Sequence, residues 1–255
     1  MNKRDLKKLR ASGEHIYFFL GLLLGVVIIF YVVGVSLYVS LGLIIFALAT
    51  VILVNSSLIG SSLLITHKSL PKVHTILDKT SKKLGIKTPK LYIQQSPELS
   101  AFTIGISNPS VVLTSGLYEV LDDEELEFVI GHEYGHILFH HNIATTFLYP
   151  AGKQIPYLNY FNDFWSRKTE YTADRIGLFC SGDIDKSISA LSKIAVGTKA
   201  FASLGKNYFM SQKEDIDSLA EKLGETLSNH PYTVNRIAKL ISFNSKNSKS
   251  IINDY

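Results

Sequence analysis

The segment from His132 to His136 has residue types and spacing that point to metal chemistry. It reads His-Glu-Tyr-Gly-His and fits the pattern H-E-x-x-H. In an α-helix, residues four apart lie on one face, so the imidazoles of His132 and His136 can reach one metal ion. Glu133 is turned about a quarter of a circle away, so it can reach a metal-bound water instead. The spacing predicts a zinc site in which the bound water has a pKa of about 7 and Glu133 takes its proton.

The sequence around this segment favours a helix from Asp122 to about His141. Asp122 suits the N-cap, Glu125 follows three residues later, and acidic residues fill the first turn. Gly131 and Gly135 each cost roughly 1 kcal/mol in a helix interior, so they indicate that another element packs closely there. The alternative is a surface helix whose histidines are incidental.

A catalytic zinc needs a third protein ligand, and the candidates are His140, His141, Glu170 and His230. A ligand at His140 would lie on the same helix as the first two, so all three protein ligands would bind the zinc from one face of that helix. Glu170 lies on a second expected helix, and Asp174 follows one turn later, where a carboxylate can orient a zinc-bound imidazole. An exposed pair of acidic residues is disfavoured by like-charge repulsion. We therefore favour Glu170 and interpret His140 and His141 as histidines near the helix C-terminus.

Residues 16–66 contain no Asp, Glu, Lys or Arg. This block is about twice as long as the roughly 20 apolar residues that one membrane-crossing helix needs, so we expect two spans, 16–33 and 41–65. Basic residues flank both ends, before the block at Lys3, Arg4, Lys7, Lys8 and Arg10 and after it at Lys68, Lys72, Lys79, Lys82 and Lys83. Both ends should therefore face the cytoplasm. The alternative, a cleavable signal peptide, is disfavoured because no small-x-small site follows the first span.

These features divide the chain into a basic cytoplasmic N-terminus (1–15), a transmembrane hairpin (16–66), a metallopeptidase domain (67–243) and a polar tail (244–255). The hairpin predicts a multi-pass protein of the cell membrane that contacts lipid and holds its catalytic domain in the cytoplasm. Gly21 and Gly25 form a GxxxG pair in the first span. We interpret this pair as packing against the second span, with self-association of the chain as the alternative.

Composition excludes some other classes of protein. The net charge of +4 comes without a basic stripe or a recognised nucleic-acid module, so nucleic-acid binding is not expected. Cys180 is the single cysteine, which excludes an intramolecular disulfide. Because it lies in an apolar stretch, it is expected to be a small buried residue.

The part of the chain after the hairpin is expected to be α+β and mostly helical, with a small β-sheet. Gly85 should end the first helix, and Pro150 and Pro156 favour a loop-rich connector over 142–165. Besides the helix that carries His132, helices are expected at 71–84 (the one that Gly85 ends), 167–180, 183–197, 213–227 and 231–243. Strands are expected at 90–94, 101–106 and 110–114.

Three further segments resemble one known family. They are Ser-Arg-x-x-Glu-Tyr-x-Ala-Asp-Arg at 166–175, His-Pro-x-x-x-x-Arg-Ile at 230–237, and Val-Val-Leu-Thr-Ser-Gly-Leu at 111–117. Together with Gly-His-Glu-Tyr-Gly-His at 131–136, they make the chain similar to the HtpX-like and CAAX prenyl protease family of membrane zinc metallopeptidases. The resemblance implies a gluzincin-type catalytic domain. It also implies one Zn²⁺ per chain, held by His132, His136 and Glu170, with Glu133 as base.

The resemblance also implies roles for residues outside the metal ligands. His230 matches a His-Pro motif near the family's active site and would stabilise the oxyanion, although a structural histidine before a helix starting at Pro231 is an alternative. Ala101, Phe102 and Arg236 are the expected substrate-binding residues. This chain has Ser100 where the family often has Asn, which affects one contact to the substrate backbone. It also lacks further spans after the zinc helix, which disfavours cleavage of prenylated peptides.

These observations favour an endopeptidase acting on membrane or membrane-proximal proteins. One alternative is a processing peptidase for a single precursor peptide. Another is a metal-stabilised membrane scaffold without activity, which would have no need of Glu133. We expect the substrate to bind as an added strand along Ser100–Gly105, because a sheet edge holds an extended backbone without demanding sequence. An interior strand with both edges occupied is the alternative.

Overall fold

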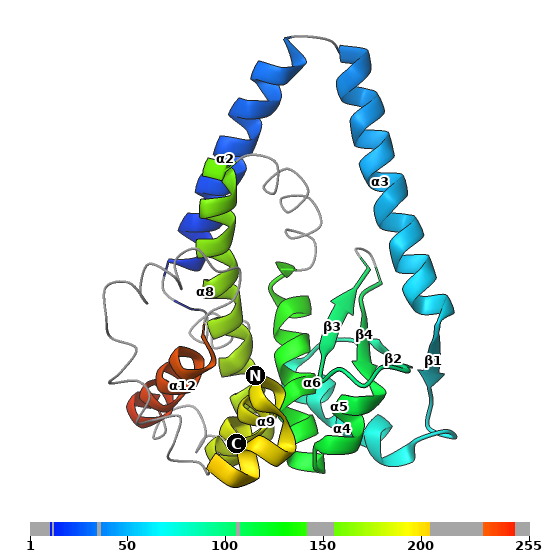
Figure 1. Cartoon of the computed structure of the whole chain (residues 1–255), viewed down its shortest axis with the longest axis vertical. Coiled ribbons are helices and arrows are strands. Elements are labelled where there is room, and N and C mark those ends of the chain that lie inside the picture. The colour runs from blue at the N-terminus through cyan, green and yellow to red at the C-terminus, as the bar shows by residue number, and fades with distance from the viewer. Residues whose placement is uncertain are drawn as a thin grey trace.

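The computed structural model describes residues 11, 13–34, 37–105, 108–141, 156–204 and 232–247 of the 255-residue chain. These residues form a mostly helical α+β structure with one small sheet, as the sequence predicts (Figure 1). The helices are α2 (Glu14–Val33), α3 (Leu37–Gly60), α4 (Pro71–Leu84), α5 (Ser115–Val120), α6 (Asp123–Leu138), α8 (Pro156–Ser181), α9 (Ile184–Leu204) and α12 (Thr233–Asn247). The strands are β1 (Ser62–Ile65), β2 (Lys90–Gln94), β3 (Ala101–Ile104) and β4 (Ser110–Thr114).

The sheet has the strand order β1-β2-β4-β3. Strands β2 and β4 are parallel, while β1 pairs with β2 and β3 pairs with β4 in antiparallel fashion. Every residue of β4 is buried, in line with its Val-Val-Leu core and its central position. Strand β3 is at the end of the sheet, so one of its backbone edges, called the open edge below, pairs with no other described strand.

The helix with the H-E-x-x-H segment begins with the predicted cap. Asp122 Oδ1 accepts from the Glu125 N–H at 2.9 Å, and Glu125 Oε2 accepts from the Asp122 N–H at 2.9 Å, which forms a capping box. The helix ends at Leu138, before the predicted end at His141. His140 has a φ of 58°, a left-handed conformation that turns the chain back at the helix end.

Glycines bring α6 and α8 into contact at the level of the backbone. A Cβ atom on Gly177 would lie 2.7 Å from the carbonyl oxygen of Phe128, and one on Gly135 would lie 3.0 Å from the Cα of Ala173. A Cβ on Gly131 would lie 2.7 Å from the Cβ of Cys180. The prediction that Gly131 and Gly135 mark a close approach by another element is therefore confirmed.

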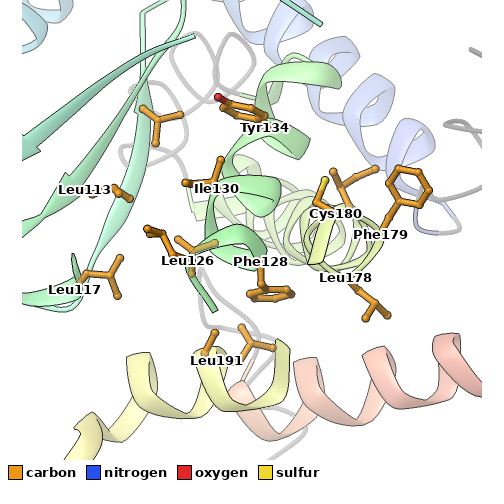
Figure 2. Packing of buried hydrophobic residues seen from close by; sticks show 14 of the residues in the cluster. Leu113, Leu117, Leu126, Phe128, Ile130, Tyr134, Leu178, Phe179, Cys180 and Leu191 are labelled. Carbon is orange, nitrogen blue, oxygen red and sulfur yellow. The ribbon is translucent and has the colours of Figure 1, made fainter. Parts of the chain in front are cut away.

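The main hydrophobic core surrounds α6. Figure 2 shows Leu113 and Leu117 on one side of this helix and Leu178 and Cys180 of α8 on the other. Cys180 is fully buried, which confirms its predicted place in the core. The core thus fixes α6 between the sheet and α8.

Three elements differ from the prediction. Pro156 is the first residue of α8 rather than a break, so residues 156–165 are helical, in keeping with the preference of proline for the first helical position. The backbone of Gly197 in α9 is non-helical, with a φ of 78°, which confirms the predicted helix end at this residue, but the helical segment that follows it to Leu204 was not predicted. The short helix α5, whose start is capped by the Thr114 side chain, was not predicted. The expected helix at 213–227 lies outside the described residues.

The N-terminal helices extend away from the sheet and α6, and Figure 1 shows them converging at their far ends. Within the described part of the chain, one helix is long and apolar enough to cross a membrane, with the window Glu14–Tyr31 having a mean hydropathy of 2.0. Helix α3 has 24 residues, Leu37–Gly60, and its part Leu37–Thr50 is also apolar. The predicted second span was wrong at its end, because Ser62–Ile65 forms β1 and pairs with β2.

The predicted packing of the Gly21 and Gly25 pair was also wrong. A Cβ on Gly21 would face Asn162 of α8 at 3.6 Å, and one on Gly25 would meet nothing within 4 Å. The first turns of α2 pack on α8 through aromatic pairs, Tyr17 with Phe164 and Phe18 with Trp165. Helix α2 is therefore docked on the helix that holds Glu170.

Candidate metal centre

Helices α6 and α8 bring three potential metal ligands together. His132 Nε2 lies 3.2 Å from His136 Nε2, and Glu170 places one carboxylate oxygen 3.5 Å from His132 Nε2 and the other 3.6 Å from His136 Nε2. All three side chains are largely buried. The structure thus brings together the three residues that the sequence predicts as ligands.

These separations fit a small tetrahedral metal. Ligand atoms about 2.0–2.1 Å from a tetrahedral zinc are about 3.3–3.4 Å apart, close to the spacings seen here. The other ring nitrogen of each histidine has a neighbour, since His132 Nδ1 lies 2.9 Å from Asp174 Oδ1 and His136 Nδ1 lies 3.1 Å from His141 Nδ1. The Nε2 atoms therefore face each other and the Glu170 carboxylate, an arrangement that a cation would stabilise.

Asp174 holds His132 as the sequence predicts. Its carboxylate accepts two hydrogen bonds from Arg236 of α12, from Nε at 2.9 Å and from Nη2 at 2.6 Å. Because an ionised carboxylate only accepts, His132 must donate from Nδ1, which leaves Nε2 with a lone pair. Arg236 also lies 3.3 Å from Glu170 through Nη1, so one guanidinium holds both Asp174 and Glu170.

Burial and charge shift the protonation of this group. Burial lowers the pKa of His136 well below its usual value, which favours the neutral imidazole that a metal requires. Burial alone would raise the pKa of Asp174, but the Arg236 charge together with the hydrogen bonds from Arg236 and His132 outweighs burial, so the pKa is lowered. Burial opposes a charged His132, yet its hydrogen bond to Asp174 and the charge of Glu170 raise its pKa.

Glu133 lies beside the ligands and is held by the sheet. The Thr103 hydroxyl of β3 donates to Glu133 Oε2 at 2.8 Å. Burial raises the pKa of Glu133 above its usual value, as suits a group that must take up a proton. Thr103 therefore links the expected base to the open edge of the sheet.

The other predicted site residues lie at different places relative to the three ligands. Ala101 and Phe102 lie half-buried on β3, close in the chain to Thr103. Arg236 lies against the ligand Glu170 and against Asp174, which holds the ligand His132. His140 is exposed and does not belong to the ligand cluster. His230 lies outside the described residues.

Sequence reasoning missed three residues of this centre. Thr103 was expected only as part of a strand. His141 was a candidate third ligand that was then interpreted as a helix-end residue, so its contact with His136 was not predicted. Glu14, which contacts His141, precedes the charge-free block and was counted with the basic N-terminus. No spacing rule predicts these contacts, because the partners are 30 and 127 residues apart in the chain.

A second cluster of potential ligands occurs in the described residues. His67, His74 and Asp78 lie together, with both imidazoles 3.2 Å from the same Asp78 oxygen. This cluster is more exposed than the first, since the His67 side chain is 64% exposed. Its two histidines share one carboxylate as in an ion pair, so it differs from the convergent arrangement of His132, His136 and Glu170.

Comparisons with known proteins agree with this geometry. The sequence model described as Peptidase family M48 matches residues 67–163 and 151–243. The chain is 32% identical over 173 residues to the plastoglobule-localized metallopeptidase 48 of Arabidopsis thaliana, covering 62% of this chain and 50% of that protein. It is 26% identical over 220 residues to the Protease HtpX homolog of Bifidobacterium longum, covering 69% of this chain and 72% of that protein. The chain thus spans about half the length of the first relative.

The ligand set can be tested by comparing Glu170→Ala with His140→Ala. The first change removes a donor from the convergent cluster and should strongly reduce the zinc content of the purified protein. The second removes an exposed imidazole outside the cluster and should leave the zinc content unchanged. Metal analysis by mass spectrometry after dialysis measures both. Loss of zinc from His140→Ala, with zinc retained by Glu170→Ala, would show that the third ligand is assigned wrongly.

Proposed function

The chain belongs to peptidase family M48 and is a metallopeptidase, and on that premise we propose that it is a membrane-anchored zinc endopeptidase that cleaves membrane or membrane-proximal proteins. One observation supports this most directly. Two imidazole Nε2 atoms and a carboxylate converge at 3.2–3.6 Å, and a buried Glu133 lies next to them. A scaffold without activity would need the three ligands but not the glutamate.

The residues of the chain can then be given roles in peptide hydrolysis. Bound zinc would lower the pKa of its water to about 7 and polarise the scissile carbonyl. Glu133 takes the water proton as general base and returns it to the leaving amine. Thr103 keeps the Glu133 carboxylate in one orientation, and Asp174 fixes the tautomer of His132. His230 is proposed to stabilise the oxyanion.

The open edge of β3 is proposed as the binding site for the substrate backbone. The carbonyl of Ser100 accepts from the Thr114 N–H, so the alternation of an antiparallel pair turns the N–H groups of Ala101 and Thr103 toward the open edge. An extended peptide could add there as a further strand. The Thr103 side chain contacts Glu133, so a peptide on this edge would lie beside the base.

Membrane anchoring through both N-terminal helices is part of the proposal. Large apolar side chains along α2 and α3 are exposed, for example Phe30 at 77%, Tyr38 at 86% and Phe46 at 71%. A contiguous apolar surface of this extent indicates a lipid environment. We propose that α2 and α3 form a two-span hairpin in the cell membrane, with the catalytic domain in the cytoplasm as the basic flanks indicate. Self-association through this hairpin is compatible with the proposal.

Glu133→Gln should keep zinc and the fold but abolish peptide cleavage. The amide preserves the size of the side chain and can still accept from Thr103, but it cannot act as a base. Loss of a general base lowers the rate by about 10² to 10⁴-fold. Purified protein in detergent is assayed for cleavage of a quenched-fluorescent peptide, and zinc is measured in parallel. Activity equal to that of the unchanged chain would contradict the assignment.

Ala101→Pro should raise the KM for long peptides and leave zinc content intact. Proline removes an N–H that faces the open edge, while the hydrogen bonds of β3 to β4 use other residues. One lost hydrogen bond corresponds to a rise of about 2- to 10-fold in KM. The matched control is Ala101→Gly, which keeps the N–H and should have nearly unchanged kinetics. Equal KM values for both variants would mean that the substrate does not lie along β3.

The proposed orientation predicts that both termini are in the cytoplasm. A C-terminal epitope tag should survive protease treatment of intact cells and be digested once the membrane is permeabilised. A tag on the opposite side of the membrane would be removed from intact cells, and that result would reverse the orientation.

A further inference from the structure

We propose that Glu14, the first residue of the anchor helix α2, is a positioning residue for the metal ligand His136 and acts through His141. The inference rests on the proposed zinc site. It adds that His136 is held in its metal-binding orientation only when α2 is packed on α8. Glu14 touches neither the substrate nor the metal in this scheme. It acts by fixing the tautomer and orientation of an intermediate imidazole.

A continuous series of contacts joins the anchor to the ligand. His136 Nδ1 lies 3.1 Å from His141 Nδ1, and His141 Nε2 lies 3.1 Å from Glu14 Oε1. The second oxygen of Glu14 accepts from the Thr172 hydroxyl of α8. The Thr172 oxygen in turn accepts from the backbone N–H of Ala11 at 2.9 Å. The series therefore crosses from α6 to α2 and ends on α8.

The hydrogen atoms in this series have one direction when His136 binds a metal through Nε2, the atom that faces His132 Nε2 and Glu170. The hydrogen of the His136 ring is then on Nδ1, which donates to the Nδ1 lone pair of His141. His141 in turn donates from Nε2 to the Glu14 carboxylate. Glu14 thus supports, through one imidazole, the tautomer of His136 that can bind the metal.

The surroundings make this series rigid. Glu14 is fully buried and His141 is 2% exposed, so water cannot take the place of either partner. The left-handed conformation of His140 turns the chain so that His141 faces back to His136 across the end of α6. The ring of Trp165 packs edge-on against His141, with ring centroids 6.0 Å apart.

The two histidine ligands receive their support from different parts of the chain. His132 is held by Asp174, which lies on the same helix as the third ligand and is fixed by Arg236. The first contact of His136 is another histidine, and the carboxylate behind that histidine comes from α2. The orientation of His136, unlike that of His132, therefore depends on where the anchor helix sits.

The test measures zinc affinity in the full-length protein in detergent, by competition with a chelator of known affinity. Glu14→Ala removes the acceptor for His141 and should weaken zinc binding by about 10- to 100-fold, as is typical when a partner of a metal ligand is lost. Glu14→Gln keeps an acceptor oxygen and should show a smaller loss. The visible spectrum of the Co²⁺-substituted protein should also change in Glu14→Ala, because it reports the ligand geometry rather than the stability of the fold.

Tyr17→Leu is the matched control. It removes the stacking of Tyr17 on Phe164 at the same helix contact but touches no member of the series, so zinc affinity should stay unchanged even if the melting temperature of the metal-free protein falls. Unchanged zinc affinity in folded Glu14→Ala would overturn the inference, and so would a loss in Glu14→Gln as large as that in Glu14→Ala. An equal loss in Tyr17→Leu would overturn it too, since docking alone would then explain the effect. If the unchanged chain binds no zinc, the proposed function itself fails.

Discussion

The backbone contact between α6 and α8 is the constraint on which the metal centre depends. Two donors come from α6 and the third from α8, so the spacing of the helices sets the spacing of the donors. Glycines at 131, 135 and 177 allow that spacing, because a Cβ atom there would lie 2.7–3.0 Å from atoms of the other helix. Each glycine destabilises a helix interior by roughly 1 kcal/mol. The apolar surface that the contact buries on α6 and α8 offsets this cost.

The charges around this contact are divided between two networks. Arg236 is shared between Asp174 and Glu170, and its charge and hydrogen bonds help to lower the pKa of Asp174 against the effect of burial. Glu133 has its hydrogen bond from Thr103 of the sheet instead. Because a neutral hydroxyl stabilises a carboxylate less than a guanidinium does, Glu133 keeps a raised pKa while the pKa of Asp174 is lowered. Neighbouring acids can thus have different proton affinities in one small volume.

Local signals in the sequence predicted the parts of this centre that depend on local geometry. The capping box of α6, the two histidines four apart and Glu170 with Asp174 one turn later all follow helical spacing. The end of the second apolar span was wrong because composition does not distinguish an apolar strand such as Ser62–Ile65 from the last turn of a membrane helix. Contacts of Thr103, His141 and Glu14 depend on tertiary packing between distant segments, so no periodicity reveals them.

The structure connects the two N-terminal helices, α2 and α3, to the elements around the ligand cluster at two places. Helix α2 docks on α8, which also holds Glu170, and α3 is followed after one residue by β1 of the sheet. The opposite end of that sheet is β3, beside Glu133. On the proposed membrane placement, both attachments hold the metal centre at a set height relative to the bilayer. The metal centre would then act on substrate segments that lie at a matching distance from the membrane. Strand β3 would need to select only an extended backbone.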